Sequence, residues 1–217
     1  MKIYNDIYNS IISPENIFAA WNTFKSDKRN KLDVAWFERD IEKHIFQMYR
    51  DLRNQRYKHG PYRAFWIRDP KLRHIYKATV RDRVLHHAVC TVLNPIFEET
   101  FIPTSFSCRI GKGTHRGVRY LRDTVRKVSA NYTRPCFVLK CDIRKFFDTV
   151  DHGILIGIIE KRITDEKTRL LLCELIGSYE QGVYERERER ENFWREAPEG
   201  YPHWQPHKPA FRQYLYE

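Results

Sequence analysis

The chain has 217 residues, of which 41% are hydrophobic and 14% aromatic, enough for a buried core in one large domain or two small ones. Its 39 lysines and arginines exceed its 28 aspartates and glutamates, so the net charge is +11. Polar residues follow Met1 and no apolar run approaches the length of a membrane span, so we expect neither a signal peptide nor a transmembrane helix. The five cysteines form no C-x-x-C pair and are odd in number, so free buried thiols in a reducing cytoplasm are the simplest interpretation.

The basic charge is concentrated between Arg50 and Arg83. This window contains eleven basic and three acidic residues and therefore carries +8 of the net +11. Aromatic residues are interleaved with the basic ones: Tyr57, Tyr62, Phe65, Trp66 and Tyr76. Basic side chains neutralise phosphates and aromatic rings stack on bases, so the pattern favours a nucleic-acid partner. The alternative is a basic surface that is simply solvated.

Two amphipathic helices are predicted before residue 60. The first begins at Ser13, which is a suitable N-cap residue and is followed by Pro14 at the first helical position. The second is expected from about Val34 to Asn54, because apolar residues recur there at helical spacing. These residues are Phe37, Ile41, Ile45, Met48 and Leu52. Packing of two helices against a common core explains both patterns.

A β-hairpin is predicted next, with strands at Tyr62–Arg68 and Arg73–Ala78 on either side of an Asp69-Pro70 turn. A long helix should follow, from about Arg81 to Thr100, since its apolar residues form a broad stripe. Lys71 and Arg73 lie at the hairpin tip. They could hold a triphosphate, or they could form an ordinary exposed basic turn.

The second half of the chain mixes elements of both kinds. A segment rich in small residues, Ser105–Gly117, precedes a helix that should reach about Ala130. Cys136–Ile143 alternates in the manner of a strand. Two further helices are expected, at about Asp151–Arg162 and Asp165–Tyr179. The predicted fold class is therefore α+β.

Asp142 ends the predicted strand. A carboxylate in such an apolar setting is costly unless something pairs with it. A divalent cation such as Mg²⁺ is one suitable partner, and a salt bridge or a cap at the strand end is the alternative. The Gly111–Gly113 segment could bring backbone N–H groups close to phosphates, although it lacks the P-loop pattern.

Four segments in series resemble bacterial reverse transcriptases of the group II intron and diversity-generating type. They are Ile67-Arg-Asp-Pro-Lys-Leu-Arg-His-Ile75, Val80-Arg-Asp-Arg-Val-Leu-His-His-Ala88, Ser105-Phe-Ser-Cys-Arg-Ile-Gly-Lys-Gly-Thr-His115 and Leu139-Lys-Cys-Asp-Ile-Arg-Lys-Phe-Phe147. The similarity runs from about Pro14 to Tyr179. It implies a fragment of a right-hand polymerase, with a helical N-terminal extension (1–60), a fingers hairpin with helices (61–135) and an incomplete palm sheet (136–180).

The resemblance implies roles for individual residues. Asp142 would be the first metal-binding aspartate of the palm, with the Ile143 carbonyl helping to hold Mg²⁺. Phe147 would be the steric gate beneath the incoming sugar, while Lys71 and Arg73 would bind the dNTP phosphates. In the family's reaction, a primer 3′-OH attacks the dNTP α-phosphate on an RNA template. The residues expected to contact nucleic acid are Arg63, Arg68, Arg81, Arg83, Arg109 and Lys112.

The chain departs from the family pattern after its predicted palm strand. The family places two further aspartates in a Tyr-x-Asp-Asp turn, but this chain has no Asp-Asp pair and no aspartate after Asp165. The thumb is missing as well. We therefore expect a truncated chain that binds Mg²⁺ weakly and does not polymerise alone. The alternative function is a maturase-like, non-catalytic RNA-binding protein that uses the basic fingers.

The tail, residues 181–217, offers an explanation for this departure. A coding sequence for Gly200–Tyr216 can be written that, read one base later, gives Ile-Pro-Ile-Gly-Asn-Leu-Thr-Ser-Gln. This peptide resembles a block that the family carries after the helices. We therefore expect an aberrant, out-of-frame tail that is poorly ordered. The alternative for Arg186–Glu191 is a charged helix stabilised by pairs of opposite charge.

Overall fold

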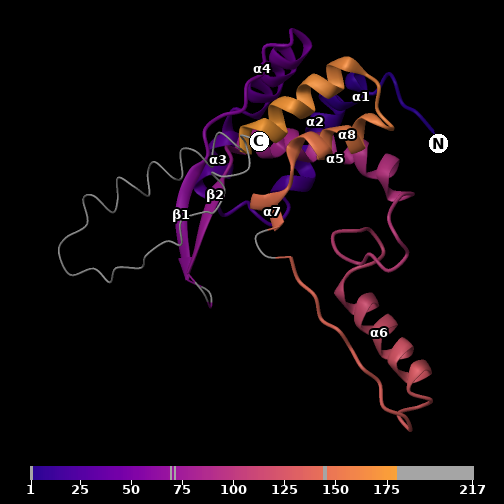
Figure 1. The fold of residues 1–217 in the computed structure, drawn as a ribbon. Helices are drawn as coiled ribbons and strands as arrows, with labels where there is room; N and C mark the ends of the chain where they lie inside the picture. The colour runs from indigo at the N-terminus through magenta and orange to yellow at the C-terminus, as the bar shows by residue number, and fades with distance from the viewer. Residues whose placement is uncertain (1, 69, 71, 144–145, 180–217) are drawn as a thin grey trace, which may run out of the picture. The chain divides into compact units, whose positions relative to one another are not determined.

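The computed structural model describes residues 2–68, 70, 72–143 and 146–179. The chain divides into two units, Met1–Gly177 and Ser178–Glu217. The first unit is α+β, as the sequence predicts, and Figure 1 shows its elements in chain order from indigo to orange. The predicted out-of-frame tail and the possible helix at Arg186–Glu191 lie outside the described residues.

The N-terminal part consists of α1 (Tyr8–Ile12), α2 (Pro14–Lys25), α3 (Leu32–Arg39) and α4 (Ile41–Arg53). The predicted start of α2 is confirmed, since Ser13 Oγ accepts a hydrogen bond of 3.2 Å from the Asn16 N–H. The single helix predicted over about Val34–Asn54 is wrong, because two helices occupy this range. Asp40 has φ −120° and ψ 37°, outside the helical region, and separates α3 from α4.

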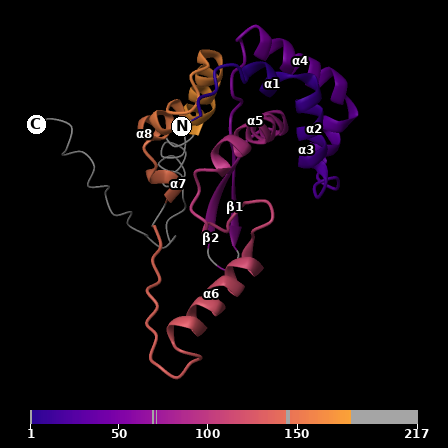
Figure 2. The same cartoon turned by 90° about the vertical axis from the view of Figure 1, so that its right-hand side faces the viewer.

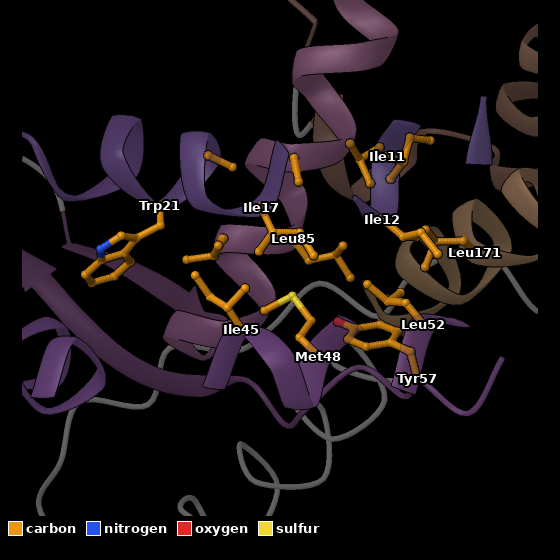
Figure 3. Packing of buried hydrophobic residues seen from close by; sticks show 14 of the residues in the cluster. Ile11, Ile12, Ile17, Trp21, Ile45, Met48, Leu52, Tyr57, Leu85 and Leu171 are labelled. Carbon is orange, nitrogen blue, oxygen red and sulfur yellow. The ribbon is translucent and has the colours of Figure 1, made fainter. Parts of the chain in front are cut away.

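The core lies between α1, α2, α4 and α5 (Val80–Glu98). Figure 3 shows Ile17 from α2, Ile45 and Met48 from α4 and Leu85 from α5 converging on one another. All four of these side chains have no exposed surface. Burial of such a side chain stabilises the fold by about 1.5–3 kcal/mol, so this cluster fixes the helices that carry the rest of the unit.

The hairpin predicted after the helices is confirmed. Strand β1 (Arg63–Arg68) pairs in antiparallel fashion with β2 (Leu72–Lys77), and both views show the two strands side by side (Figures 1 and 2). The register places Arg63 opposite Lys77, Phe65 opposite Ile75 and Ile67 opposite Arg73. These two strands form the only sheet in the described part of the chain.

The helix predicted from about Arg81 is confirmed as α5, which begins one residue earlier. Thr79 caps it, because its hydroxyl oxygen accepts a hydrogen bond of 3.2 Å from the Asp82 N–H. The predicted helix after the glycine-rich segment is confirmed as α6 (Thr114–Val128), which buries none of its residues. Gly111 and Gly113 have φ of +71° and +83°, which glycine adopts without the strain of a side chain.

The strand predicted over Cys136–Ile143 is wrong. Residues 136–143 form no regular secondary structure, and Phe137 and Leu139 are 95% and 88% exposed. An alternating pattern alone does not make a strand, because a strand needs a neighbour that accepts its hydrogen bonds. None of the described residues provides one. The incomplete palm sheet is therefore not formed in the described residues.

The remaining helices are α7 (Phe146–Thr149), α8 (His152–Glu160) and a helix over residues 166–179. The last two correspond to predicted helices, whereas α7 was not predicted. An unforeseen contact ties this region to the N-terminus, since Tyr4 pairs with Ile163 in a parallel bridge. Asp165 Oδ2 also accepts hydrogen bonds from the N–H groups of Ile7 and Tyr8, at 3.1 and 2.8 Å.

Candidate nucleic-acid interface

The β1–β2 hairpin carries exposed cations together with exposed apolar side chains. Arg63, Arg68 and Arg73 are exposed, and none of the three makes a hydrogen bond or ion pair with its side chain among the described residues. Phe65, Trp66 and Ile67 are also exposed, Trp66 by 59%. Lys71, the other predicted phosphate ligand at the tip, lies outside the described residues.

Arg81 and Arg83, which the sequence also assigns to nucleic-acid contacts, are engaged within the protein. Arg81 donates to the Lys58 carbonyl over 2.5 Å and lies over the Tyr57 ring. Arg83 pairs with Asp33 at 2.8 Å, and its guanidinium lies over the Phe24 ring. Both arginines therefore hold the start of α5 in place.

Arg109 and Lys112 are engaged in a similar way. The Arg109 guanidinium pairs with Glu98 through two nitrogens and also donates to the carbonyls of Ile102 and Ser105. Lys112 Nζ donates to the Pro103 carbonyl over 2.6 Å. These contacts stabilise the loop between α5 and α6. The predicted interface is thus divided between exposed hairpin arginines and residues that are bound internally.

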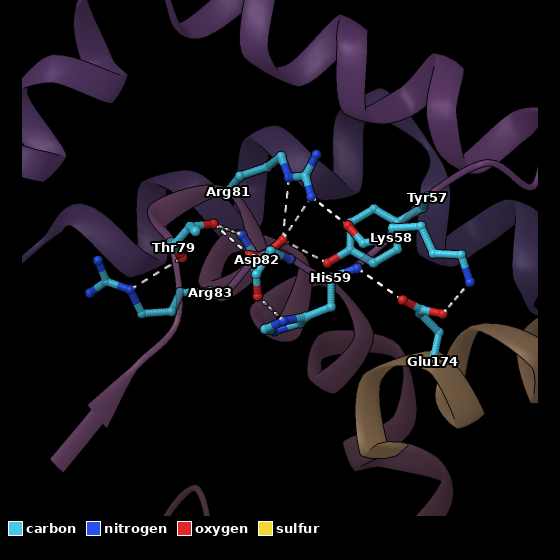
Figure 4. Close-up of polar contacts among 9 residues, drawn as sticks. Tyr57, Lys58, His59, Thr79, Arg81, Asp82, Arg83 and Glu174 are labelled. Atoms are coloured by element: carbon cyan, nitrogen blue, oxygen red, sulfur yellow. Dashed lines mark hydrogen bonds and ion pairs between the residues drawn. The ribbon is translucent and has the colours of Figure 1, made fainter. Parts of the chain in front are cut away.

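A buried carboxylate, Asp82, fixes the segment that leads into the hairpin (Figure 4). Asp82 is fully buried and accepts hydrogen bonds from the Tyr57 hydroxyl at 2.8 Å, the Thr79 hydroxyl at 2.5 Å and the Gly60 N–H at 3.1 Å. Burial alone would raise the pKa of Asp82. The hydrogen bonds from Thr79 and Tyr57 outweigh burial and hold its pKa below the usual range.

A second carboxylate, Glu174, holds the same segment from the helix over residues 166–179. Glu174 accepts from Lys58 Nζ at 2.7 Å and from the His59 N–H at 3.0 Å, as Figure 4 shows. Burial opposes ionisation of Glu174, yet these two donors keep its pKa low. Residues 57–60 are therefore attached to two different helices before the chain enters β1.

A third carboxylate, Asp33 of α3, holds the other end of the hairpin. Its Oδ2 atom lies 2.6 Å from Lys77 Nζ, at the end of β2, and 2.8 Å from Arg83 Nη2 of α5. Burial would raise the pKa of Asp33, but the Lys77 ammonium and the Arg83 guanidinium lower it. Both ends of the hairpin are thus anchored on the N-terminal half of α5, while its exposed side chains stay available.

The predicted catalytic residues Asp142, Ile143 and Phe147 are all exposed. Asp142 and Ile143 are the last two residues of the irregular segment 136–143, and Phe147 of α7 is 78% exposed. Among the described residues, no hydrogen bond, ion pair or ring contact joins Asp142 or Phe147 to Arg73. Phe147 instead contacts the Phe146 ring edge-on, at a centroid distance of 5.3 Å.

Mg²⁺ binding at Asp142 and the Ile143 carbonyl stays a prediction. A magnesium site needs several oxygen ligands in near-octahedral geometry, and Asp142 is the only carboxylate that the resemblance assigns here. In the described part of the chain, no group of three or more His, Cys, Asp or Glu side chains could hold a metal. Asp142 and the Ile143 carbonyl therefore stay predicted ligands, and no catalytic step follows from them.

Three carboxylates that anchor the hairpin were not predicted from the sequence: Asp33, Asp82 and Glu174. A local signal existed for Asp82, because Thr79 followed three residues later by an acid is close to the capping pattern at a helix start. Asp33 and Glu174 are far from their partners along the chain. Their roles depend on tertiary contacts that periodicity does not reveal.

Several known proteins are similar to this chain in sequence. The chain is 29% identical over 143 residues to Protein YkfC of Escherichia coli, a match that covers 64% of the chain and 37% of that protein. It is 23% identical over 182 residues to the group II intron-encoded protein LtrA of Lactococcus lactis, covering 81% of the chain and 29% of that protein. The similarities support a reverse transcriptase-like family.

A third relative extends the comparison to a eukaryote. Nuclear intron maturase 1 of Arabidopsis thaliana is 28% identical over 87 residues, which is 40% of the chain and 11% of that protein. The chain spans 37% of the length of YkfC, 29% of LtrA and 11% of the maturase. No protein-family model matches it. Among the described residues, no helix is both long enough and apolar enough to cross a membrane.

Proposed function

We propose that this chain binds RNA through the β1–β2 hairpin, as the fingers region of a protein related to group II intron reverse transcriptases and maturases. One observation carries the proposal. Arg63, Arg68 and Arg73 are exposed and unpaired among the described residues, on a hairpin that also exposes Phe65 and Trp66. Cations that neutralise phosphates beside rings that stack on bases are the components of a single-strand binding groove.

The anchoring of the hairpin supports this proposal. A binding surface is more effective when it is held in place, because less conformational entropy is lost when the ligand binds. Asp82 and Glu174 fix the segment before β1, and Asp33 fixes the end of β2. The internal arginines Arg81 and Arg83 take part in these anchors and would contribute to RNA binding by positioning the hairpin.

The family's reaction is RNA-directed DNA synthesis, in which a primer is extended with dNTPs on an RNA template. We propose that this chain alone binds its template without extending the primer. Two-metal catalysis needs more carboxylates than Asp142, and the described residues do not group three metal ligands. The truncation before Tyr-x-Asp-Asp and the kinship with diversity-generating retroelements belong to the same proposal.

The test is an RNA-binding titration alongside a primer-extension assay on the same purified chain. We expect salt-sensitive binding and no extension. The double variant Arg68→Gln/Arg73→Gln should weaken binding about 25-fold at 0.1 M salt, since each lost contact to a single strand removes about 0.7 from the salt slope. Arg29→Gln, at an exposed arginine in the loop after α2, is the matched control and should bind like the wild type.

Extension assays separate this proposal from the catalytic alternative. DNA synthesis that is lost in Asp142→Asn would show a working polymerase and contradict the proposed inactivity. Absence of RNA binding by the wild-type chain would contradict the proposed function itself. Weak binding that does not respond to salt would also count against it, because phosphate contacts release counterions and must be salt-dependent.

A further inference from the structure

The hairpin places two cations directly opposite each other at the end farthest from its tip. Arg63 of β1 and Lys77 of β2 are partners in the antiparallel register, so their side chains leave the same face of the sheet. Like charges in this arrangement destabilise a hairpin. An anion near the two cations would relieve this repulsion.

The protein supplies a compensating carboxylate to one of these cations. Lys77 Nζ pairs with Asp33 at 2.6 Å, but the same Asp33 oxygen is shared with Arg83 at 2.8 Å. Arg63 is exposed, and its side chain has no hydrogen-bond or ion-pair partner in the described part of the chain. One carboxylate thus serves Lys77 and Arg83, and the charge of Arg63 is left uncompensated.

The same face continues towards the tip with apolar and then basic side chains. The next pair on this face is Phe65 with Ile75, followed by Ile67 with Arg73. Four residues separate Arg63 from the position opposite Arg73, a distance of about 14 Å at 3.4 Å per residue. An exposed aromatic ring therefore lies between two cationic ends on one face of the hairpin.

We infer that Arg63, beside the Asp33-bound Lys77, forms a second phosphate site at the base of the hairpin, so that a single RNA strand lies along the face bearing Arg63, Phe65 and Arg73. This inference rests on the proposed RNA binding and adds to it. The strand's phosphates contact both ends of the face, and a base stacks on Phe65 between them. The phosphate at the base end neutralises the repulsion between Arg63 and Lys77.

This arrangement predicts that Arg63 affects stability and RNA binding in opposite directions. Arg63→Gln removes the repulsion, so the Tm of the free protein should rise by about 1–3 °C. The same variant loses a phosphate contact, so binding of a fluorescein-labelled oligouridylate should weaken about 5-fold at 0.1 M salt. Its salt slope should fall by about 0.7.

Arg63→Glu sharpens the test, because a glutamate could pair with Lys77 across the strands. We expect a Tm at or above that of Arg63→Gln, together with a greater loss of RNA affinity. Arg29→Gln, which removes the same charge from an exposed loop, should change neither the Tm nor the salt slope. The control separates the local effect of Arg63 from the general effect of net charge.

The possible results distinguish the second phosphate site from the proposed RNA binding as a whole. Wild-type binding with an unchanged salt slope in Arg63→Gln would overturn the second phosphate site and leave the proposed function standing. A fall in Tm in both Arg63 variants would show a structural role for the arginine and overturn the inference as well. A wild-type chain that does not bind the oligouridylate at all would overturn the proposed function and this inference together.

Discussion

The Tyr57 hydroxyl donates a hydrogen bond of 2.8 Å to Asp82, and the two side chains are 7% and 0% exposed. This contact joins the segment before the hairpin to the first turn of α5. Burial, followed by the nearby Asp82 charge, raises the pKa of Tyr57, so the hydroxyl keeps its proton and remains a donor.

Loss of this donor should destabilise the protein. In Tyr57→Phe, the ring still fills its space but Asp82 loses one of the hydrogen bonds that compensate its burial. A buried carboxylate that loses a partner costs about 1–3 kcal/mol. Urea denaturation should show this loss in the free energy of unfolding. Tyr49→Phe is the matched control, because Tyr49 is only partly buried, and it should change the free energy by less than about 0.5 kcal/mol.

Gly60 should tolerate no larger residue. A Cβ atom at this position would lie 2.9 Å from Asp82 Oδ2 and 3.0 Å from Thr79 Cγ2. Asp82 cannot move aside, since it is buried and held by several donors. We expect Gly60→Ala to destabilise the fold by about 1–3 kcal/mol, the usual cost of an overpacked site. Gly157→Ala in α8, where no atom lies within 4 Å of the added carbon, should be neutral or stabilising.

Stability should fall on mild acidification because of His86. Burial lowers the pKa of His86 to about 4, with a smaller contribution from the His59 charge. The unfolded chain has the ordinary histidine pKa of about 6.5, so as the pH falls below that value the unfolded state takes up a proton that the folded state refuses. The contribution is complete above about pH 6.5 and is lost progressively towards about pH 4.

The measurement compares unfolding at two pH values. Between about pH 7 and about pH 5, His86 should account for a loss of about 2 kcal/mol in the free energy of unfolding. His86→Asn should reduce this difference, whereas His115→Asn, at an exposed histidine of α6, should leave it unchanged. An equal pH dependence in the His86 variant and the wild type would contradict the assignment.

A helix or strand could be predicted from the sequence when the residues that stabilise it are close to it along the chain. The start of α2 was predictable because Ser13 caps it from the adjacent position. The α1 helix was not predictable from local sequence. The acceptor for the Ile7 and Tyr8 N–H groups is Asp165, which is more than 150 residues away in sequence. Residues 136–143 have the alternation of a strand but no neighbouring strand in the described structure. The alternation of residues cannot show whether a neighbouring strand is present to pair with this segment.

The candidate site shows the same distinction. The basic, aromatic hairpin was predictable, because turn residues and alternation are local signals. The sequence could not separate exposed arginines from those that hold the fold together. Arg68 and Arg73 remain exposed, whereas Arg83 pairs with Asp33 and Arg109 with Glu98. Charge counted along a chain records how many cations exist and does not show which of them already have partners.

Arg109 should therefore behave as a structural residue. Its guanidinium pairs with Glu98 and donates to two loop carbonyls, so Arg109→Gln removes several charge-assisted hydrogen bonds at once. We expect a fall in Tm of about 3–10 °C, with RNA affinity unchanged at a temperature where the variant is folded. Arg119→Gln on α6, an exposed arginine, should not change the Tm. A loss of RNA affinity without a loss of stability would contradict this and support the predicted contact of Arg109 with RNA.

The reading-frame hypothesis for Gly200–Tyr216 concerns residues outside the described structure, so DNA must test it. Tryptophan has only one codon, so the bases at Trp204 are fixed, and the last two of them begin a glycine codon in the neighbouring frame. If the hypothesis is right, the gene in that frame encodes Ile-Pro-Ile-Gly-Asn and, farther on, a Tyr-x-Asp-Asp run. Restoring the frame should then yield a protein that extends primers, with activity lost in Asp142→Asn. A neighbouring frame without these codons would rule out the frameshift and favour a chain that functions by binding alone.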